Sequence, residues 1–171
     1  LVERTDRYSR EQSGALAARR IHVAFPLLPV SHREVVVETI GSEPFVAALP
    51  AGHKLLDQER LSLADLRHEQ FALVSRSVGS NFYELVIQAC GQAGFIPHVA
   101  LDAGHVMTEL GFVAAGLGVS VVPGPLRSRE VEGVVFRDLH RAPSVEVGVA
   151  YRRDTKSKDI IAVLAVGRDA P

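Results

Sequence analysis

Cysteine and long apolar stretches are scarce in this sequence. Cys90 is the single cysteine among the 171 residues, so no disulfide framework can form within the chain, and we expect Cys90 to be a small core residue. No apolar run approaches the roughly 18 residues that a membrane-spanning helix requires. No basic start followed by an apolar block marks a signal peptide. These absences exclude a disulfide-stapled scaffold and predict no membrane contact.

An excess of basic charge is also missing. The chain has 19 Lys and Arg residues against 20 Asp and Glu residues, which gives a formal net charge of −1. A domain that binds nucleic acid by itself would carry a basic stripe. With 47% hydrophobic and 23% charged residues, the composition instead indicates a globular domain with a sizeable core.

Motifs for catalysis and for metal binding are absent as well. The seven histidines include no pair at metal-ligand spacing and no H-E-x-x-H, and the chain has neither a P-loop nor a G-x-S-x-G elbow. We therefore predict no catalytic residue, no metal and no cofactor. One enzymatic alternative stays open, an α/β hydrolase with Ser77 or Ser80 as its nucleophile, for which His105 would be the base.

The glycine-rich stretch "FVAAGLGVSVVP", residues 112–123, predicts a structural turn rather than a phosphate loop. A dinucleotide fingerprint places its glycines after a strand and before a helix. Here the helix comes first, because apolar residues recur at helical spacing over residues 105–115. Gly116 predicts the end of that helix, and residues 119–122 predict a short buried strand that Pro123 ends.

Strands alternate with helices along most of the chain, which is typical of an α/β fold with parallel strands and crossover helices. Two long strands, at residues 45–49 and 145–151, enclose a self-contained βαβαβ block. A block entered by one strand and left by another predicts two lobes joined by a double-strand hinge, with a ligand cleft between them. The stretch "GSEP" is expected to bend, and Ser62 is expected to cap a short helix. The other expected strands span residues 2–6, 21–25, 35–40, 71–74, 98–101, 119–122 and 134–136, and the expected helices span residues 9–19, 82–93, 105–115 and 160–166.

The strongest candidate for a ligand site is "LVSRSVGSNF", residues 73–82. Three serines follow a predicted strand, and a helix begins near Asn81, which can form a cap with Glu84. A helix start leaves free backbone N–H groups and a partial positive charge, which can bind a carboxylate. Two other helix starts are similar, at Ser9 and at "LDAGH", residues 101–105. Residues 73–82 can equally be a helix cap beside a solvated loop, and the other two helix starts, taken alone, fit a cap better than a site.

Four stretches together resemble the effector-binding domain of LysR-type transcriptional regulators. "YSREQSGALAARRIHVAF" is similar to the second strand, second helix and third strand of that domain, and "SEPFVAALPAGHKLL" to its first hinge strand and the loop that follows. "FVAAGLGVSVVP" resembles its most recognisable late motif, and "VEVGVAYRRD" its return hinge strand. The resemblance covers nearly the whole chain in the right order. It implies an α/β, two-lobed fold like that of type 2 periplasmic-binding proteins, with lobe I at residues 1–48 and 143–171 and lobe II at residues 49–142.

The resemblance also implies a function and a set of binding residues. A small-molecule effector, such as an aromatic or other organic acid, would bind between the lobes and shift the conformation of a cytoplasmic dimer or tetramer that controls transcription. No chemistry would be done on the ligand, and DNA would be bound only through a winged helix-turn-helix domain that this chain lacks. Carried over by position, the effector-lining residues would be Ser9, Ser75, Ser80, Asn81, Phe82, Asp102, Ala103 and Gly104.

The sequence departs from the family pattern at two places. The chain opens at Leu1 without Met and without the first strand and first helix of lobe I, so we expect a fragment with an incomplete lobe I. The stretch Pro26-Leu27-Leu28 is apolar, whereas some relatives that sense aromatic acids carry an arginine there, and this difference permits a less polar effector. A periplasmic solute-binding protein of the same fold, which would carry a signal peptide or lipid anchor, stays open as the alternative function.

Overall fold

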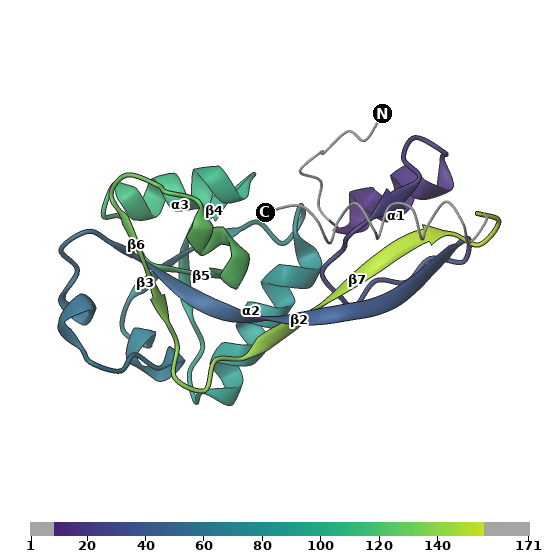
Figure 1. Ribbon diagram of the computed structural model, residues 1–171. Coiled ribbons are helices and arrows are strands. Elements are labelled where there is room, and N and C mark those ends of the chain that lie inside the picture. Colours follow the sequence, from purple (N-terminus) through teal and green to yellow (C-terminus); the bar gives the residue numbers. More distant parts are fainter. Residues whose placement is uncertain (1–8, 156–171) are drawn as a thin grey trace. The chain divides into compact units, whose positions relative to one another are not determined.

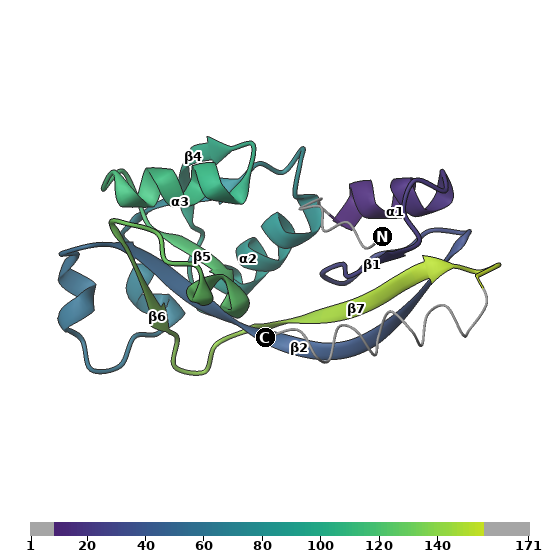
Figure 2. The same ribbon diagram turned by 45° about the horizontal axis from the view of Figure 1, so that its top comes forward.

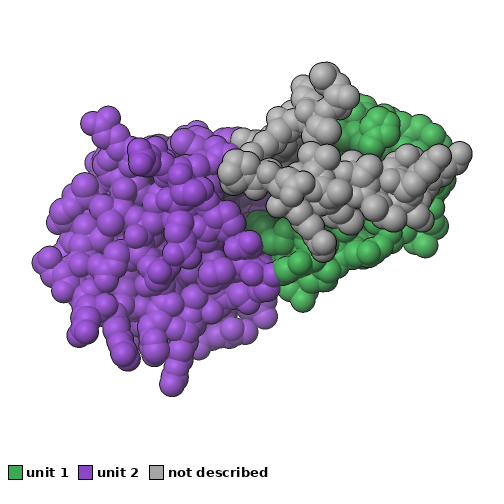
Figure 3. Space-filling view, in the orientation of Figure 1, with its two compact units in different colours: residues 1–41, 146–171 green, residues 42–145 purple. Residues whose placement is uncertain are grey.

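A computed structural model of the chain describes residues 9–155. The strand expected at residues 2–6 and the helix expected at residues 160–166 lie outside the described residues. The chain divides into two compact units, unit 1 with residues 1–41 and 146–171, and unit 2 with residues 42–145 (Figure 3). The lobe boundaries that the resemblance implies, after residues 48 and 142, stay a prediction.

Unit 1 combines one helix with the end of a sheet. α1 (Ser9–Ala17) packs on β1 (Val23–Ala24), which pairs antiparallel with β7 (Ser144–Arg152). β1 is shorter than the strand expected at residues 21–25, although contact with β7 continues beyond it, where the carbonyl of Pro26 accepts the N–H of Gly148 at 3.0 Å. Among the described residues of this unit, Leu16, Ala24, Val35 and Ala150 form a buried core cluster.

β2 (Val35–Pro50) is one continuous strand of 16 residues, where two strands separated by a bend were expected. In the sheet it lies between β7 and β5, and Figures 1 and 2 both show β7 running along it. Main-chain pairing continues directly after Pro44, because the N–H of Phe45 donates to the carbonyl of Pro143 at 2.8 Å. The expected bend at "GSEP" was therefore wrong, since pairing with a neighbouring strand outweighs the weak strand preference of glycine and proline.

Unit 2 contains a parallel two-stranded sheet, which a short parallel bridge joins to a larger antiparallel sheet. β3 (Gln70–Val74) and β4 (His98–Ala103) are parallel neighbours. Backbone hydrogen bonds between β3 and Val119, just before β5 (Ser120–Pro123), continue the parallel arrangement. β2 then pairs antiparallel with both β5 and β6 (Val134–Asp138). The expected parallel pattern therefore holds for β3, β4 and β5, whereas β2 runs in the opposite direction.

Two helices connect the parallel strands of unit 2. α2 (Ser80–Gln92) joins β3 to β4, and α3 (Val106–Ala114) joins β4 to β5. α3 packs against β3 and lies beside β4 in both ribbon views (Figures 1 and 2).

Across residues 9–155, no helix is long and apolar enough to cross a membrane. Short 3-10 helices fill other connections: η1 (Lys54–Asp57), η2 (Leu63–Leu66), which starts after Ser62 as expected, and η3 (Gly124–Ser128).

The glycine-rich stretch at residues 112–123 has the structural role that its sequence predicts. α3 ends at Ala114, and Gly116 has a φ of 73°, in the left-handed region that favours glycine. A Cβ on Gly118 would lie 2.7 Å from the carbonyl oxygen of Gln70, so only glycine lets the chain pass this close to β3. α3 and β5 contribute to a buried core cluster, which contains Val46, Ala48, Ala72, Leu110, Val113 and Val122.

Candidate functional site

Two chain segments beside neighbouring parallel strand ends form the candidate site. We name them together the rim, which comprises residues 75–82 after β3 and residues 102–105 at the end of β4. β3 and β4 end side by side, because Val74 is in register with Ala103. The N–H of Ser75 then donates to the Ala103 carbonyl at 2.8 Å. In open α/β sheets, the carboxyl ends of the strands are the usual place for a ligand.

Ser75 begins a tight turn that leads from β3 to α2. Its carbonyl accepts the N–H groups of Val78 at 3.0 Å and Gly79 at 2.9 Å. Its side chain is buried, and its Oγ lies 2.6 Å from the Oγ of Ser77. Ser75 therefore shapes the turn. Ser77, one of the two nucleophiles of the hydrolase alternative, has another serine hydroxyl rather than a base as its partner.

α2 begins close to the expected residue but without the expected cap. Its N-cap is Gly79, which has no side chain to accept from the first-turn N–H groups. The carboxylate of Glu84 instead pairs with Arg76, at 2.5 Å between Oε1 and Nε. The prediction of a cap formed by Asn81 and Glu84 was wrong, because a cation on the preceding turn competes for the carboxylate.

Phe82, in the first turn of α2, packs against β2. Its ring meets the buried ring of Phe45 edge to face, with 5.4 Å between the ring centroids and an interplanar angle of 68°. Such aromatic pairs add stabilisation beyond the burial of apolar area. Phe82 is half-buried, so this side chain has a structural contact besides any contact with a ligand.

β4 runs two residues past its expected end and includes Asp102 and Ala103. Asp102 is exposed and Ala103 is buried, so these neighbours face opposite sides of the strand. Gly104 alone separates β4 from the helix cap, and a Cβ there would meet no atom within 4 Å, which leaves open space beside it. His105 is the N-cap of α3, and its Nδ1 accepts the N–H of Met107 at 3.2 Å.

The predicted effector residues divide between the two units. Ser80 is the first residue of α2 in unit 2, and Ser9 is the first residue of α1 in unit 1. The fold brings all the other predicted residues together with Ser80 on the rim: Ser75, Asn81, Phe82, Asp102, Ala103 and Gly104. Their contact with an effector, and that of Ser9, stays a prediction.

A buried carboxyl group that sequence analysis did not single out lies beneath the rim. Glu109 of α3 has no exposed surface, its Oε2 accepts the N–H of Val74 at 2.8 Å, and its Oε1 accepts the hydroxyl of Ser120. Burial raises the pKa of Glu109 to about 7, although the hydrogen bonds from Ser120 and Val74 oppose that shift. The available signal was a charged residue within one apolar stretch and a serine within another, because a buried polar residue needs a partner.

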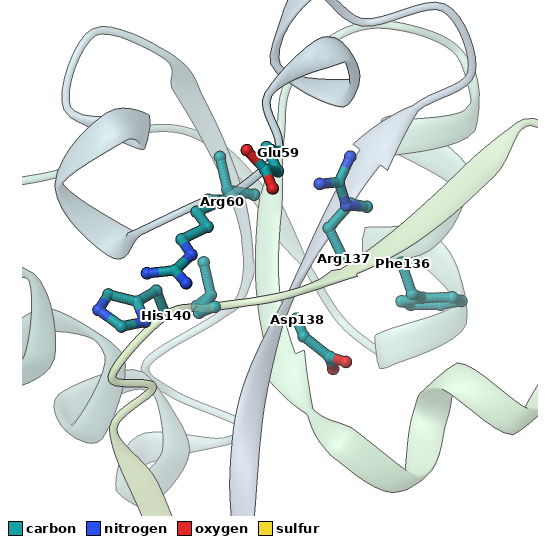
Figure 4. Close-up of a pocket in the computed structure, with 8 residues that line it drawn as sticks. Glu59, Arg60, Phe136, Arg137, Asp138 and His140 are labelled. Atoms are coloured by element: carbon teal, nitrogen blue, oxygen red, sulfur yellow. The ribbon is translucent and has the colours of Figure 1, made fainter.

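A hollow of about 540 Å³ lies elsewhere on unit 2 (Figure 4). Arg137 in its wall donates to the backbone carbonyls of Leu56 at 2.5 Å and Gln58 at 2.6 Å, and Asp138 pairs with Arg127 at 2.8 Å. Arg137 and Asp138 therefore already have partners, and no rim residue lines the hollow. The lining residues are Glu59, Arg60, Leu61, Phe136, Arg137, Asp138, Leu139 and His140.

Comparison with known families identifies the family of the chain. A family model described as "LysR substrate binding domain" matches residues 3–169. The chain belongs to this family. The family match favours the interpretation of the chain as a LysR-type effector-binding domain over the two alternatives, a periplasmic solute-binding protein and an α/β hydrolase.

Individual relatives share sequence with the chain, and solved structures share its fold. The HTH-type transcriptional regulator AlsR of Bacillus subtilis (strain 168) is 30% identical over 154 residues, which are 90% of this chain and 51% of AlsR. The chain therefore spans about half the length of the curated relatives it matches. The effector binding domain of a BenM variant has a TM-score of 0.78 at 26% identity, over 90% of this chain and 73% of that one. Full-length CbnR complexed with its target DNA has a TM-score of 0.80 at 24% identity, over 95% of this chain and 57% of that one.

These likenesses bear on the fold that the sequence predicts. The BenM domain has the same architecture as this chain over 90% of the chain. The predicted fold class, α/β and like that of type 2 periplasmic-binding proteins, is confirmed for this LysR substrate-binding domain.

Proposed function

We propose that this LysR substrate-binding domain is the effector-sensing part of a transcriptional regulator. It binds a small molecule at the rim of unit 2, and the bound molecule shifts the conformation of the regulator. The family match and the likeness to AlsR, an HTH-type transcriptional regulator, support the regulatory role. The observation that carries the site is the shared end of β3 and β4, where Ser75 binds the Ala103 carbonyl and the strands lead into two helix starts.

The chemistry of the rim suits a small organic acid. The start of α2 has a glycine N-cap, so no capping side chain from that position competes with an anionic group for the first-turn N–H groups. Phe82 supplies an aromatic ring next to that helix start, and the open space beside Gly104 admits a ligand atom close to the backbone. An aromatic acid uses both properties. Ser9 of unit 1 is proposed as a further contact.

The proposed mechanism is a shift between conformations, with no chemical step on the ligand. An effector can move such an equilibrium only by the difference between its affinities for the two states. We propose that the shift passes to a winged helix-turn-helix domain of the whole protein through a dimer or tetramer in the cytoplasm. Use of the His105 imidazole as a helix cap supports a non-catalytic role for the rim.

Thermal unfolding of the purified chain in the presence of benzoate and a panel of other aromatic and aliphatic acids tests the proposal. A ligand that binds only the folded state raises the melting temperature with concentration. Gly104→Leu fills the open space beside the rim and should abolish the rise. The control Gly91→Leu, at an exposed position of α2 with equally open surroundings, should keep it.

Two results would count against the proposal. A ligand that stabilises Gly104→Leu as strongly as the wild type does not bind beside Gly104. Hydrolysis of an ester such as p-nitrophenyl acetate, lost on His105→Ala, would instead favour the hydrolase alternative.

A further inference from the structure

Glu109 connects three elements of unit 2 directly beneath the rim. Its carboxyl group accepts the N–H of Val74, the last residue of β3, at 2.8 Å, and the hydroxyl of Ser120, the first residue of β5. Its own N–H, in the first turn of α3, donates to the carbonyl of His105 at 3.1 Å. Val74 precedes the first rim residue and His105 is the last one. Glu109 is therefore linked to both rim segments, through its side chain to the end of β3 and through its main chain to His105.

No described charge balances this carboxyl group. α3 packs against β3, β4, β5 and β6, of which β3 and β5 carry no titratable side chain. Arg137 on β6 donates to backbone carbonyls instead, and burial raises the pKa of Glu109 to about 7 against the two hydrogen bonds that lower it. The titratable side chains on the packed strands and at the start of α3 are His98, Asp102, His105, Arg137 and Asp138.

The two hydrogen bonds differ in the protonation states they allow. The N–H of Val74 can only donate, so Oε2 must accept in every state, whereas the hydroxyl of Ser120 can donate or accept. Oε1 can therefore take up a proton while the hydroxyl reverses its direction, and both contacts persist. After ionisation the same contacts enclose a negative charge in an apolar core, which is costly without a cation.

We propose that Glu109 is a positioning residue for the rim, which it holds firmly as a protonated carboxyl group and releases more readily once ionised. Opening of the rim lets water reach the carboxylate, so ionisation favours the opened state over the closed one. The importance of the rim for sensing rests on the proposed function. The opening itself can be measured without any effector.

Amide hydrogen exchange on the purified 171-residue chain tests this inference. We expect the population of rim-open molecules to rise about tenfold from about pH 6 to about pH 8, since the pKa of Glu109 is about 7 in the closed state and 4.5 in the ordinary exposed state. After correction for intrinsic exchange rates, the rise should appear in the amides of residues 75–82 and 102–105. It should be absent from the amides of η1 and β6.

Three variants distinguish the titration of Glu109 from other causes of a pH-dependent rise in amide exchange. Glu109→Gln keeps an acceptor for Val74 and a donor for Ser120 but cannot ionise, so the rise should disappear. His105→Asn keeps an N-cap acceptor and removes the imidazole, so the rise should persist. Glu130→Gln changes an exposed carboxylate and should behave like the wild type.

Clear outcomes overturn the inference. These are a rise that survives in Glu109→Gln, a rise that disappears in His105→Asn, and a rise shared equally by all amides of unit 2. If Glu109→Gln fails to fold, carbon-13 titration of the Glu109 carboxyl group in the wild type replaces it, and a midpoint below about 5 rejects the inference. A failed effector screen counts against the proposed function alone, whereas a flat exchange profile in the wild type counts against this inference alone.

Discussion

The main-chain N–H of Val74 donates to the carboxyl group of Glu109, 35 positions further along the chain, at 2.8 Å. This bond joins the last residue of β3 to the first turn of α3, although the intervening chain forms α2 and β4. The donor and the acceptor are both buried, so loss of either partner leaves a polar group unsatisfied. The end of β3 and the start of α3 are therefore coupled.

We expect the free energy of unfolding to fall as pH rises from about 4.5 to about 8, because the pKa of Glu109 is about 7 in the folded protein and 4.5 in the unfolded chain. Between these two pKa values the folded state binds more protons than the unfolded chain. The stabilisation that comes from the protonated Glu109 carboxyl group is therefore complete below about pH 4.5 and is lost above about pH 7. The difference amounts to about 3 kcal/mol. Urea denaturation across this range measures it.

The matched control for this prediction is Glu109→Gln, which has no carboxyl group to titrate. Other acidic groups contribute to both profiles, so the difference between wild type and variant isolates Glu109. Parallel profiles for the two proteins would show that Glu109 titrates alike in the folded and unfolded states.

Gly118→Ala should destabilise unit 2 by about 1–3 kcal/mol, because the new Cβ would lie 2.7 Å from the carbonyl oxygen of Gln70 and the backbone would have to move. Gly111→Ala is the control, since this exposed position of α3 has no atom within 4 Å of the new Cβ. Alanine is the better helix former, so this change should stabilise by up to about 1 kcal/mol. Urea midpoints that move in the same direction for both variants would contradict the close approach.

The edge-to-face pair of Phe45 and Phe82 should show a coupling energy of about 1 kcal/mol beyond burial. A double-mutant cycle with Phe45→Leu and Phe82→Leu, read by urea denaturation, measures this coupling while large apolar side chains remain at both positions. A coupling energy of zero would mean that the two rings contribute only as separate apolar surfaces.

Cys90 should be unreactive in the folded protein. The side chain has no exposed surface, and burial raises the pKa of its thiol to about 12, so almost no thiolate is present at neutral pH. A colorimetric disulfide reagent should react with Cys90 only after unfolding in urea. Rapid labelling of the native chain would place the thiol outside the core.

Local sequence patterns predicted much of the fold. The apolar spacing before "GLG" predicted α3, and the short apolar run after it predicted β5, because both depend on neighbours in the sequence. The continuity of β2 was not predictable in this way. Gly41 and Pro44 favour a bend locally, but β2 gains hydrogen bonds from strands far away in the chain.

The candidate site, like the fold, was predictable from the sequence only where it depends on residues close together in the chain. The serines and the helix start after β3 are visible in the sequence and predicted one half of the rim. The buried position of Ser75, the contact between Phe82 and Phe45, and the bonds of Glu109 depend on pairings between distant residues. No spacing rule in a single sequence specifies such pairings, so these roles appear only in the structure.

Unit 2 is one contiguous stretch of chain, whereas unit 1 is assembled from two separate stretches. Near the two ends of unit 2, the N–H of Phe45 donates to the carbonyl of Pro143 at 2.8 Å, so the chain enters and leaves at adjacent points. Domains whose two ends lie close together tolerate domain insertion and circular permutation. We therefore expect that unit 2 can be exchanged between relatives without lengthening any connection, and the rim and Glu109 would be carried with it.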